Sequence, residues 1–206
     1  MTRVLDMLSS GVHDAKNQLF IAESLIVKAE TEHGIVLDQA RFAIEQAASR
    51  LTRVLTAYRL QRHLGQLSIT LLGVRDLLDE AAVINGGHCR SLGLALDVDA
   101  PADLWWPLDR ELSLDIVSNA LQNASRFARE RIRLSATQED GMLVLRVEDD
   151  GPGFESTDID DMATRGLGLF VARELALLHT RNGRQGSLAL YNGGCYGGAV
   201  FELRLP

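Results

Sequence analysis

The chain has 206 residues, of which 46% are apolar, 24% are charged and 5% are aromatic. An apolar fraction of this size excludes general disorder and a fibrous protein, and the length suits one or two compact domains. The formal net charge of −7 argues against a protein that grips a nucleic-acid backbone.

Cysteine use and hydropathy narrow the class of protein further. Cys89 and Cys195 are too few for a disulfide framework, and neither has a second cysteine at metal-ligand spacing, so we expect two reduced thiols. No stretch reaches the ~18 apolar residues of a membrane span, and the N-terminus lacks the apolar core of a signal peptide. We therefore expect a cytoplasmic protein with no membrane segment.

The first elements that the sequence predicts are two long helices. Apolar residues in the first helix alternate between steps of three and four, which is the a/d pattern of a heptad: Leu5, Leu8, Val12, Ala15, Leu19, Ala22, Ile26 and Ala29. The same alternation runs from Leu37 to Tyr58, and His33-Gly34 between the two runs predicts a tight turn. Each arm has ~28 residues and a length of ~42 Å.

A single helical hairpin cannot cover both of these apolar stripes, whereas two hairpins can cover them by packing as a four-helix bundle. We therefore predict that residues 1–64 form a dimerisation domain and that the protein is a homodimer. The alternative is that the hairpin packs on the remainder of its own chain.

Residues 65–206 show a different pattern, in which short strands alternate with helices. The first half of this region predicts a strand at 68–72, a helix at 74–85 that ends at Gly86-Gly87, and strands at 92–98 and 105–106. A helix then runs from the N-cap Asp109 to about residue 128, and strands at 132–137 and 143–147 are joined by a turn at 139–141. The chain closes with a helix at 168–179 and strands at 188–191 and 199–205. Mixed elements of this kind predict a two-layer α/β sandwich.

One predicted helix of this second region carries an unusual polar stripe. Asn119, Asn123 and Arg126 follow one another at steps of four and three, so they share one helical face. Amide oxygens suit a hard cation, and a guanidinium suits phosphate oxygens. The stripe therefore predicts contacts with a metal–polyphosphate.

Two glycine-containing segments follow this helix. Asp149, Gly151 and Gly153 come directly after a strand, where a carboxylate can accept a hydrogen bond from an exocyclic amine and glycines let the backbone turn closely around a ring. Gly166 and Gly168 open the next helix, whose first backbone N–H groups favour phosphate. Each segment alone is a weak signal, because turns and flexible helix starts use the same residues. In this order they predict a nucleotide site.

At these segments the chain resembles the sensor histidine kinases. Residues 119–126 (NALQNASR) resemble their N box, residues 149–154 (DDGPGF) their G1 box and residues 165–170 (RGLGLF) their G2 box. Residues 12–17 (VHDAKN), in the helical hairpin, are similar to the H box of the same kinases. The resemblance covers essentially the whole chain and implies the ATP-binding fold shared with type II topoisomerases, mismatch-repair ATPases and heat-shock chaperone ATPases.

The resemblance also implies a role for each matched residue around ATP and Mg²⁺. Asp149 would recognise the adenine amino group, Asn123 would hold Mg²⁺ with support from Asn119, and Arg126 would contact the phosphates. The residues of the two glycine-rich boxes would wrap the nucleotide: Gly151, Gly153, Gly166, Leu167 and Gly168.

His13 is the phospho-acceptor that the resemblance implies. The heptad places His13 and Asn17 at outward positions b and f, where a docked domain can reach them, although an ordinary surface histidine would fit there as well. Asp14 would orient the imidazole and take its proton, or it is only a solvated helix charge. Asn17 stands where some relatives align a water for dephosphorylation. Phe20 is a candidate docking contact for a receiver domain, with packing inside the bundle as the alternative.

We therefore predict a cytoplasmic kinase that autophosphorylates His13 and passes the phosphoryl group to an aspartate on a separate response regulator. Only residues 154–165 separate Gly153 from Gly166, so the ATP lid is short, and few residues precede His13, so we expect no sensor domain and an upstream sensory partner instead. The alternatives are a dimeric histidine phosphotransfer protein with a degenerate ATP-binding domain, an anti-sigma-type serine kinase, and a structural coiled-coil adaptor.

Overall fold

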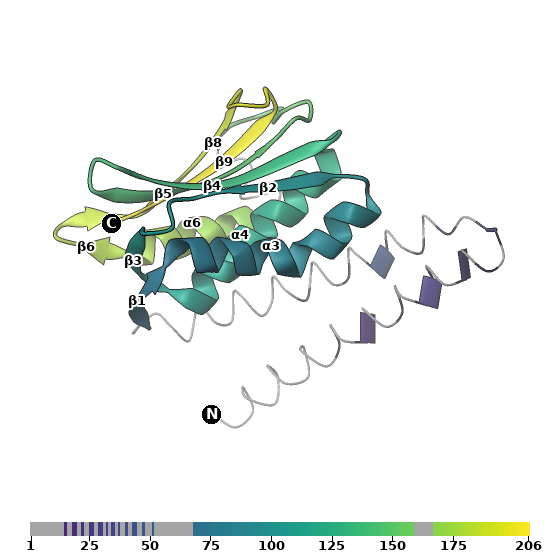
Figure 1. The fold of residues 1–206 in the computed structure, drawn as a ribbon, viewed down its shortest axis with the longest axis horizontal. Helices are drawn as coiled ribbons and strands as arrows, with labels where there is room; N and C mark the ends of the chain where they lie inside the picture. The colour runs from purple at the N-terminus through teal and green to yellow at the C-terminus, as the bar shows by residue number, and fades with distance from the viewer. Residues whose placement is uncertain are drawn as a thin grey trace. The chain divides into compact units, whose positions relative to one another are not determined.

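The chain divides into two compact units, Met1–Arg62 and His63–Pro206. The computed structural model describes residues 68–158 and 167–206, together with scattered positions between residues 15 and 51. Figure 1 shows the path of the chain.

The described positions of the first unit are helical on both sides of a turn at Gly34. The amide of Gly34 donates to the carbonyl of Glu30 at 3.0 Å, and the Glu30 carboxylate accepts from the amide of Leu37 at 2.8 Å. All described residues of this unit are either half-buried or exposed. The half-buried group includes every described seam position of the first heptad run: Ala15, Leu19, Ala22, Ile26 and Ala29.

The second unit is built on a five-stranded sheet (Figure 1). Its strands, in spatial order, are β2 (Ala95–Asp99), β4 (Arg131–Glu139), β5 (Met142–Asp149), β9 (Ala199–Leu205) and β8 (Ser187–Asn192). The strands β2 and β4 pair in parallel, and all other neighbours are antiparallel. The β4–β5 turn is formed by Asp140 and Gly141, both with positive φ, as a tight hairpin turn requires.

Two short antiparallel ribbons stand beside this sheet. One pairs β1 (Ile69–Gly73) with β3 (Trp105–Asp109), and the other pairs β6 (Thr180–Arg181) with β7 (Arg184–Gln185). The strands β6 and β7 were not expected from the sequence, because two residues are too few to show a period.

Three helices cover one face of the sheet: α3 (Val74–Ser91), α4 (Arg110–Phe127) and α6 (Leu167–Leu178) (Figure 1). The structure therefore confirms the two-layer α/β sandwich. Large aliphatic side chains fill the space between the layers, and those almost fully buried are Leu78, Leu108, Leu112, Ile116, Leu121, Ile132, Leu134, Leu143, Leu145, Leu203 and Leu205. Burial of each stabilises the fold by about 1.5–3 kcal/mol.

The predicted helix end at Gly86-Gly87 is wrong, because α3 continues through both glycines to Ser91. Burial of Asn85, Gly86 and Cys89 extends the apolar stripe of the helix past the glycines and outweighs their low helix propensity. The helix is terminated instead by Gly93, just after the C-cap Leu92, and the φ of Gly93 is +73°. The amides of Gly93 and Leu94 donate back to the carbonyls of Arg90 and Cys89, which is a Schellman motif. Strand β2 therefore begins at Ala95 and not at residue 92.

Asp109 begins α4 as the sequence predicted, and it also holds the start of the sandwich. One carboxylate oxygen accepts from the amide of Leu112 at 3.2 Å, which caps the helix. The other accepts from the amide of Ser68 at 2.9 Å. The side chain is buried, so the bond to Leu112 is shielded from water, whereas the bond to Ser68 is half-buried.

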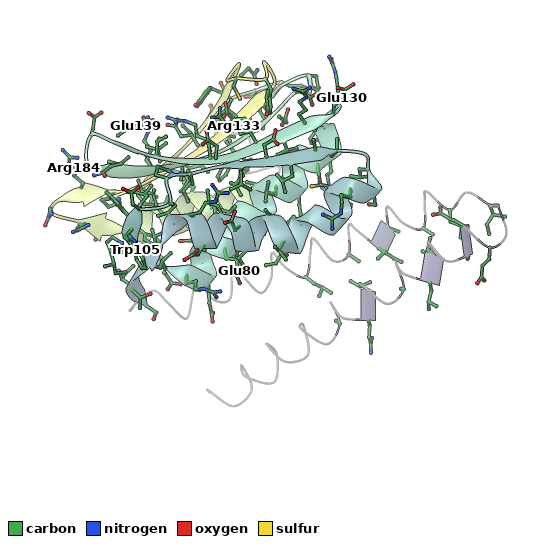
Figure 2. All side chains as sticks on the ribbon, viewed as in Figure 1. Glu80, Trp105, Glu130, Arg133, Glu139 and Arg184 are labelled. Carbon is green, nitrogen blue, oxygen red and sulfur yellow. The ribbon has the colours of Figure 1, made fainter. Side chains whose placement is uncertain are left out.

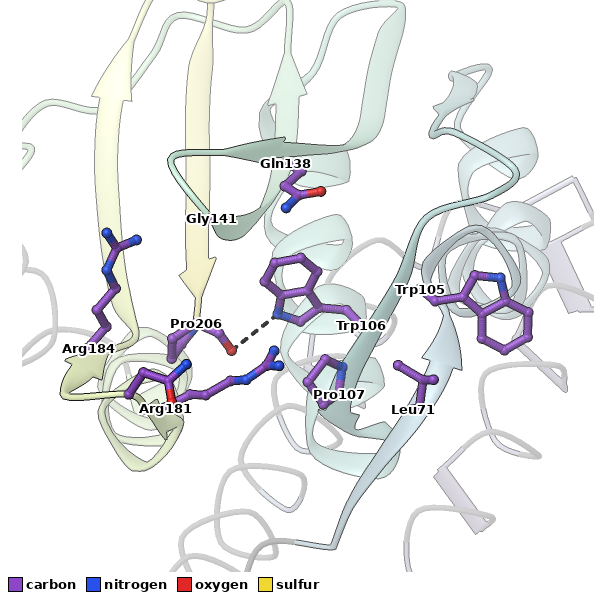
Figure 3. A pocket seen from close by; sticks show the side chains of 10 residues that line it. Leu71, Trp105, Trp106, Pro107, Gln138, Gly141, Arg181, Arg184 and Pro206 are labelled. Atoms are coloured by element: carbon purple, nitrogen blue, oxygen red, sulfur yellow. Dashed lines mark hydrogen bonds between the residues drawn. The ribbon is translucent and has the colours of Figure 1, made fainter.

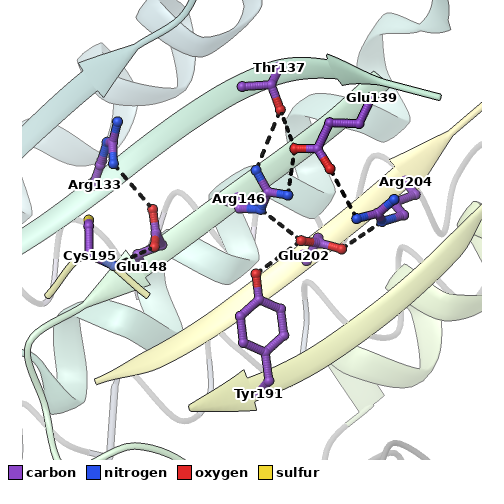
Figure 4. A network of polar contacts seen from close by, with 9 residues as sticks. All are labelled: Arg133, Thr137, Glu139, Arg146, Glu148, Tyr191, Cys195, Glu202 and Arg204. Carbon is purple, nitrogen blue, oxygen red and sulfur yellow. Dashed lines mark hydrogen bonds and ion pairs between the residues drawn. The ribbon is translucent and has the colours of Figure 1, made fainter. Parts of the chain in front are cut away.

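The outer face of the sheet carries an ion-pair network (Figure 4). Glu202 pairs with Arg146 and Arg204, each at 2.7 Å, and Glu139 pairs with the same two arginines at 2.7 and 3.2 Å. Burial raises the pKa of Glu202, but the bonds from Arg204 and Arg146 outweigh it and hold the pKa below its ordinary value. Two carboxylates balance two guanidinium groups, so this network leaves no net charge to attract a ligand. Figure 2 shows Glu139 and Arg133 on this face, away from the helices.

Candidate functional site

Asp149, the last residue of β5, is the centre of the candidate site. The residue is only 4% exposed. Its Oδ1 accepts hydrogen bonds from the amides of Gly151 at 2.8 Å and Ala199 at 3.1 Å. Its Oδ2 has no hydrogen-bond partner within the described residues and is not sealed from solvent, so it can accept a bond from a ligand.

The carboxylate of Asp149 is held in an environment that disfavours its charge. Burial raises its pKa above the ordinary value of 3.8, and the negative charge of Asp150 adds to this effect. The hydrogen bonds from Gly151 and Ala199 lower the pKa and offset part of the rise. A bond from an amino group to Oδ2 would stabilise the ionised form in the same way.

Three glycines let the backbone close tightly around Asp149. A Cβ on Gly151 would stand 2.5 Å from the carbonyl oxygen of Phe127, and one on Gly198 would stand 2.4 Å from the carbonyl oxygen of Asp149. Gly153 has a φ of +85°, and a Cβ there would stand 2.7 Å from Asn192 Oδ1. Alanine does not fit at any of these three positions without movement of backbone or side chains.

The sequence analysis found Gly151 and Gly153 but missed Gly198 and Asn192. Asn192 Oδ1 accepts from the amide of Phe154 at 2.7 Å, and Asn192 Nδ2 donates to the carbonyl of Phe154 at 2.9 Å. This pair of bonds fixes the backbone that follows Gly153. The run of glycines between β8 and β9 was the available signal, but it indicated only a turn.

The end of α4 lies against the same loop. Asp150 accepts from the amide of Arg129 at 2.7 Å and from that of Glu130 at 3.1 Å, which ties the residues after α4 to the end of β5. Burial raises the pKa of Asp150, but these backbone bonds outweigh it and hold the pKa below its ordinary value. Together with the close approach of Gly151 to Phe127, they bring the C-terminal turns of α4 next to Asp149.

The polar stripe of α4 lies in the C-terminal half of this helix, whose last turn approaches the loop after Asp149. Asn119 is half-buried, whereas Asn123 and Arg126 are exposed. Asn123 lies one helical turn before Phe127, the residue whose carbonyl approaches Gly151. Arg126 has no ion pair with the described residues, so its charge is available to an anion.

Other residues singled out in the sequence are not described or only partly described. His13, Asp14, Asn17, Phe20 and Gly166 lie outside the described residues. Leu167 and Gly168 form the first turn of α6. Within the described part of the chain, no group of three or more His, Cys, Asp or Glu side chains is arranged to hold a metal ion.

Comparisons with known proteins identify the family of the chain. Residues 109–206 match the family of histidine kinase-, DNA gyrase B- and HSP90-like ATPases. Sensor protein kinase CarS of Pseudomonas aeruginosa is 33% identical over 190 residues, which cover 85% of this chain and 42% of CarS. The chain belongs to the sensor histidine kinases and carries their ATPase domain.

Sensor protein PhoQ of Escherichia coli is a further relative, 28% identical over 183 residues that cover 82% of this chain and 37% of PhoQ. The histidine kinase chain thus spans about two fifths of the length of the curated relatives CarS and PhoQ, at 42% and 37%. The family match supports ATP as the nucleotide of the site.

Solved histidine kinases share the fold. The structure of AdeS from Acinetobacter baumannii superposes with a TM-score of 0.64 at 15% identity, over 92% of this chain and 95% of that chain. Full-length ShkA in complex with AMPPNP gives 0.61 at 19% identity, over 98% of this chain and 45% of ShkA. The catalytic domain of ThkA gives 0.59 at 20% identity, over 68% of this chain and 96% of that chain.

Among the described residues, no helix combines the length and the apolar character that crossing a bilayer requires.

Proposed function

We propose that this histidine kinase transfers the γ-phosphoryl group of ATP to His13 and then to an aspartate on a separate response regulator. The observation that carries the proposal is Asp149, whose buried carboxylate has one open oxygen beside a helix that bears Asn123 and Arg126. In this proposal Asp149 Oδ2 accepts a hydrogen bond from the adenine amino group.

The stripe on α4 would hold the charged end of the nucleotide. Asn123 offers a side-chain oxygen to Mg²⁺ with Asn119 beside it, and Arg126 donates to phosphate oxygens. The chain brings no carboxylate cluster for the ion among its described residues, which suits a cation that arrives bound to the triphosphate. Bound Mg²⁺ would neutralise phosphate charge. Gly151 and Gly153 before the lid, with Gly166, Leu167 and Gly168 after it, would enclose the phosphates.

The chemical step requires positioning and few covalent participants. The neutral imidazole of His13 attacks the γ-phosphorus, so that an N–P bond forms and the bond to the ADP oxygen breaks. Asp14 orients the ring and takes its proton. The phosphoryl group then passes from the imidazole to a carboxylate of the receiver domain, which docks near Phe20. Asn17 aligns a water molecule that hydrolyses the phosphorylated receiver, which is a phosphatase activity towards the response regulator.

A homodimer through residues 1–64 is part of the proposal. The described seam residues of the first unit are half-buried or exposed within one chain, so their apolar surface is available to a second copy. Packing of two hairpins as a four-helix bundle would bury it. We place this dimer in the cytoplasm, where an upstream sensory partner controls it.

The test is incubation of the purified protein with Mg²⁺ and γ-labelled ATP. We expect a label that is lost in acid, as phosphohistidine is, and that is absent from His13→Gln and Asn123→Ala. His88→Gln is the matched control, because His88 lies on α3 and is assigned no role in the proposed reaction, and it should label like the wild type.

Two other outcomes would replace the proposal. No label from ATP, together with phosphoryl exchange between His13 and a phosphorylated receiver, would identify a phosphotransfer protein with a degenerate ATP-binding domain. An acid-stable label on a serine of a partner protein would identify an anti-sigma-type serine kinase.

A further inference from the structure

A pocket of about 690 Å³ lies at the end of the sheet opposite to Asp149 (Figure 3). Asp149 pairs with Ile132 at one end of the β4–β5 ladder, whereas the pocket reaches Gly141 in the turn at the other end. Seven residues of β4 separate these ends, which is about 23 Å of strand. The pocket is therefore separate from the nucleotide site, and its volume suits a small organic ligand.

The cationic side of the pocket is the β6–β7 ribbon. Arg181 and Arg184 both line the pocket and are directly paired across the two strands. Like charges in directly opposed positions destabilise a ribbon. Arg184 donates to the backbone carbonyl of Asp140, and neither arginine forms an ion pair with a carboxylate of the described residues.

Among the described residues, Arg181 and Arg184 share this lack of an ion pair with Arg126 and differ in this respect from several other arginines of the sandwich. Ion pairs with carboxylates are formed by Arg75, Arg110, Arg133, Arg146 and Arg204. An anion bound by Arg181 would supply negative charge beside the ribbon and reduce the repulsion between the two arginines. A guanidinium fits planar oxyanions because it can donate two parallel hydrogen bonds.

The opposite side of the pocket is apolar and held in place. Trp106 is 7% exposed, and its indole N–H donates to the main-chain oxygen of Pro206 at 3.2 Å, which uses the only polar group of the ring. Pro107 and Leu71 continue this wall. Figure 3 shows the Arg181 side chain reaching towards Trp106 and Pro107, so the charge lies next to the apolar surface.

We propose that this pocket binds a small organic oxyanion, a carboxylate or phosphate group on an apolar body, with the anionic group on Arg181, the body on Trp106 and Pro107, and Arg184 as a second positive charge on the pocket wall. The proposal does not depend on ATP binding or on phosphoryl transfer. It assigns to the sandwich a second ligand site that shares no residue with the nucleotide site.

Tryptophan fluorescence tests the proposal directly, because the chain has only two tryptophans and both line the pocket. Benzoate and phenyl phosphate are the probes, with benzyl alcohol as the uncharged analogue and inorganic phosphate as the anion without an apolar body. We expect saturable changes with benzoate or phenyl phosphate, and at least tenfold weaker binding of the other two. The stronger of the first two probes identifies the anionic group.

Arg181→Gln should weaken probe binding at least tenfold, whereas Arg90→Gln, on α3 outside the pocket, should bind like the wild type. Removal of one of two opposed charges should leave the unfolding midpoint of Arg181→Gln equal to or above that of the wild type. ADP should leave probe binding unchanged. The proposal would be overturned if no probe bound saturably, if benzyl alcohol bound as well as the anions, or if ADP competed with the probe. It would also be overturned if Arg181→Gln bound the probe like the wild type or had a lower unfolding midpoint.

Discussion

Asp149 combines a buried position with one unsatisfied carboxylate oxygen, and this pairing decides what its substitution will do. In Asp149→Asn the amide oxygen can still accept from Gly151 and Ala199, but an NH₂ group replaces Oδ2. A donor would then face the adenine amino group, which is also a donor. We expect ADP affinity to fall about 100-fold, close to the ~3 kcal/mol of a lost hydrogen bond to a charged group. Calorimetric titration with ADP measures it, and an unchanged affinity would contradict the assignment.

The raised pKa of Asp149 predicts how this binding depends on pH. Because the ionised carboxylate accepts the amino hydrogen bond, affinity should be full above the folded-state pKa and be lost as the pH falls through it. This loss should begin at a higher pH than the ordinary value of 3.8 would give. The raised pKa also means that ionisation of Asp149 lowers the free energy of unfolding as the pH rises from 3.8 through the folded-state pKa. ADP titrations at successively lower pH test this, with Asp149→Asn as the control that should lack this component.

Position 198 requires glycine because neighbouring backbone atoms lie very close to it, and not because of its φ. Its Cβ position lies 2.4 Å from the Asp149 carbonyl oxygen, so Gly198→Ala forces the backbone of β5 or β9 to move. We expect a loss of about 1–3 kcal/mol in the free energy of unfolding, as for other overpacked sites, and weaker ADP binding. Gly197→Ala is the neighbouring control. No heavy atom lies within 4 Å of its Cβ position, so it should lower stability only through its φ of +82° and should bind ADP normally.

One glycine inside α3 and one just after its end should change stability in opposite directions when they are substituted. Neither Gly87 nor Gly93 would bring a new Cβ within 4 Å of another residue's atoms. Gly87 lies inside the helix, so Gly87→Ala should stabilise the fold by about 0.5–1 kcal/mol. Gly93 has a φ of +73°, so Gly93→Ala should destabilise it by about 1–2 kcal/mol. Denaturant unfolding of the two variants gives both values, and equal signs would contradict the observed end of α3.

Elements with local signals were predictable from the sequence. The Asp109 cap and the Asp140-Gly141 turn depend on nearest neighbours in the chain, and the structure has both. The end of α3 was not predictable, because burial of Cys89 in the tertiary fold outweighs the local preference of Gly86-Gly87.

The same distinction applies to the candidate site. Asp149, Gly151 and Gly153 stand together in one short segment, so the sequence showed them. Asn192 and Gly198 reach the site only because β8 and β9 pair and bring them beside a segment about 40 residues earlier in the chain. Asn192, for example, bonds to Phe154, which is 38 residues away in the sequence. A contact of that sequence separation leaves no periodic pattern.

At the scale of the whole molecule, the half-buried seam of the first unit predicts the oligomeric state. Ile26 is half-buried at a seam position, whereas its neighbour Leu25 is 60% exposed. A charge at the seam would have to be desolvated in a bundle, so Ile26→Glu should shift the protein from dimer towards the 22.6 kDa monomer. Leu25→Glu should leave the dimer intact. Sedimentation equilibrium distinguishes them, and a wild-type monomer would contradict the predicted bundle.

The carboxylate of Asp109 has a mechanical consequence for the molecule. It holds the amide of Ser68, where the chain enters the sandwich, and the amide of Leu112, at the first turn of α4. Tension applied to the polypeptide ahead of Ser68 can thus reach the start of the helix that bears Asn119 and Asn123 through this side chain as well as through the β1–β3 ribbon, in which Ile69 pairs with Asp109. The force can reach that helix without deforming the sheet.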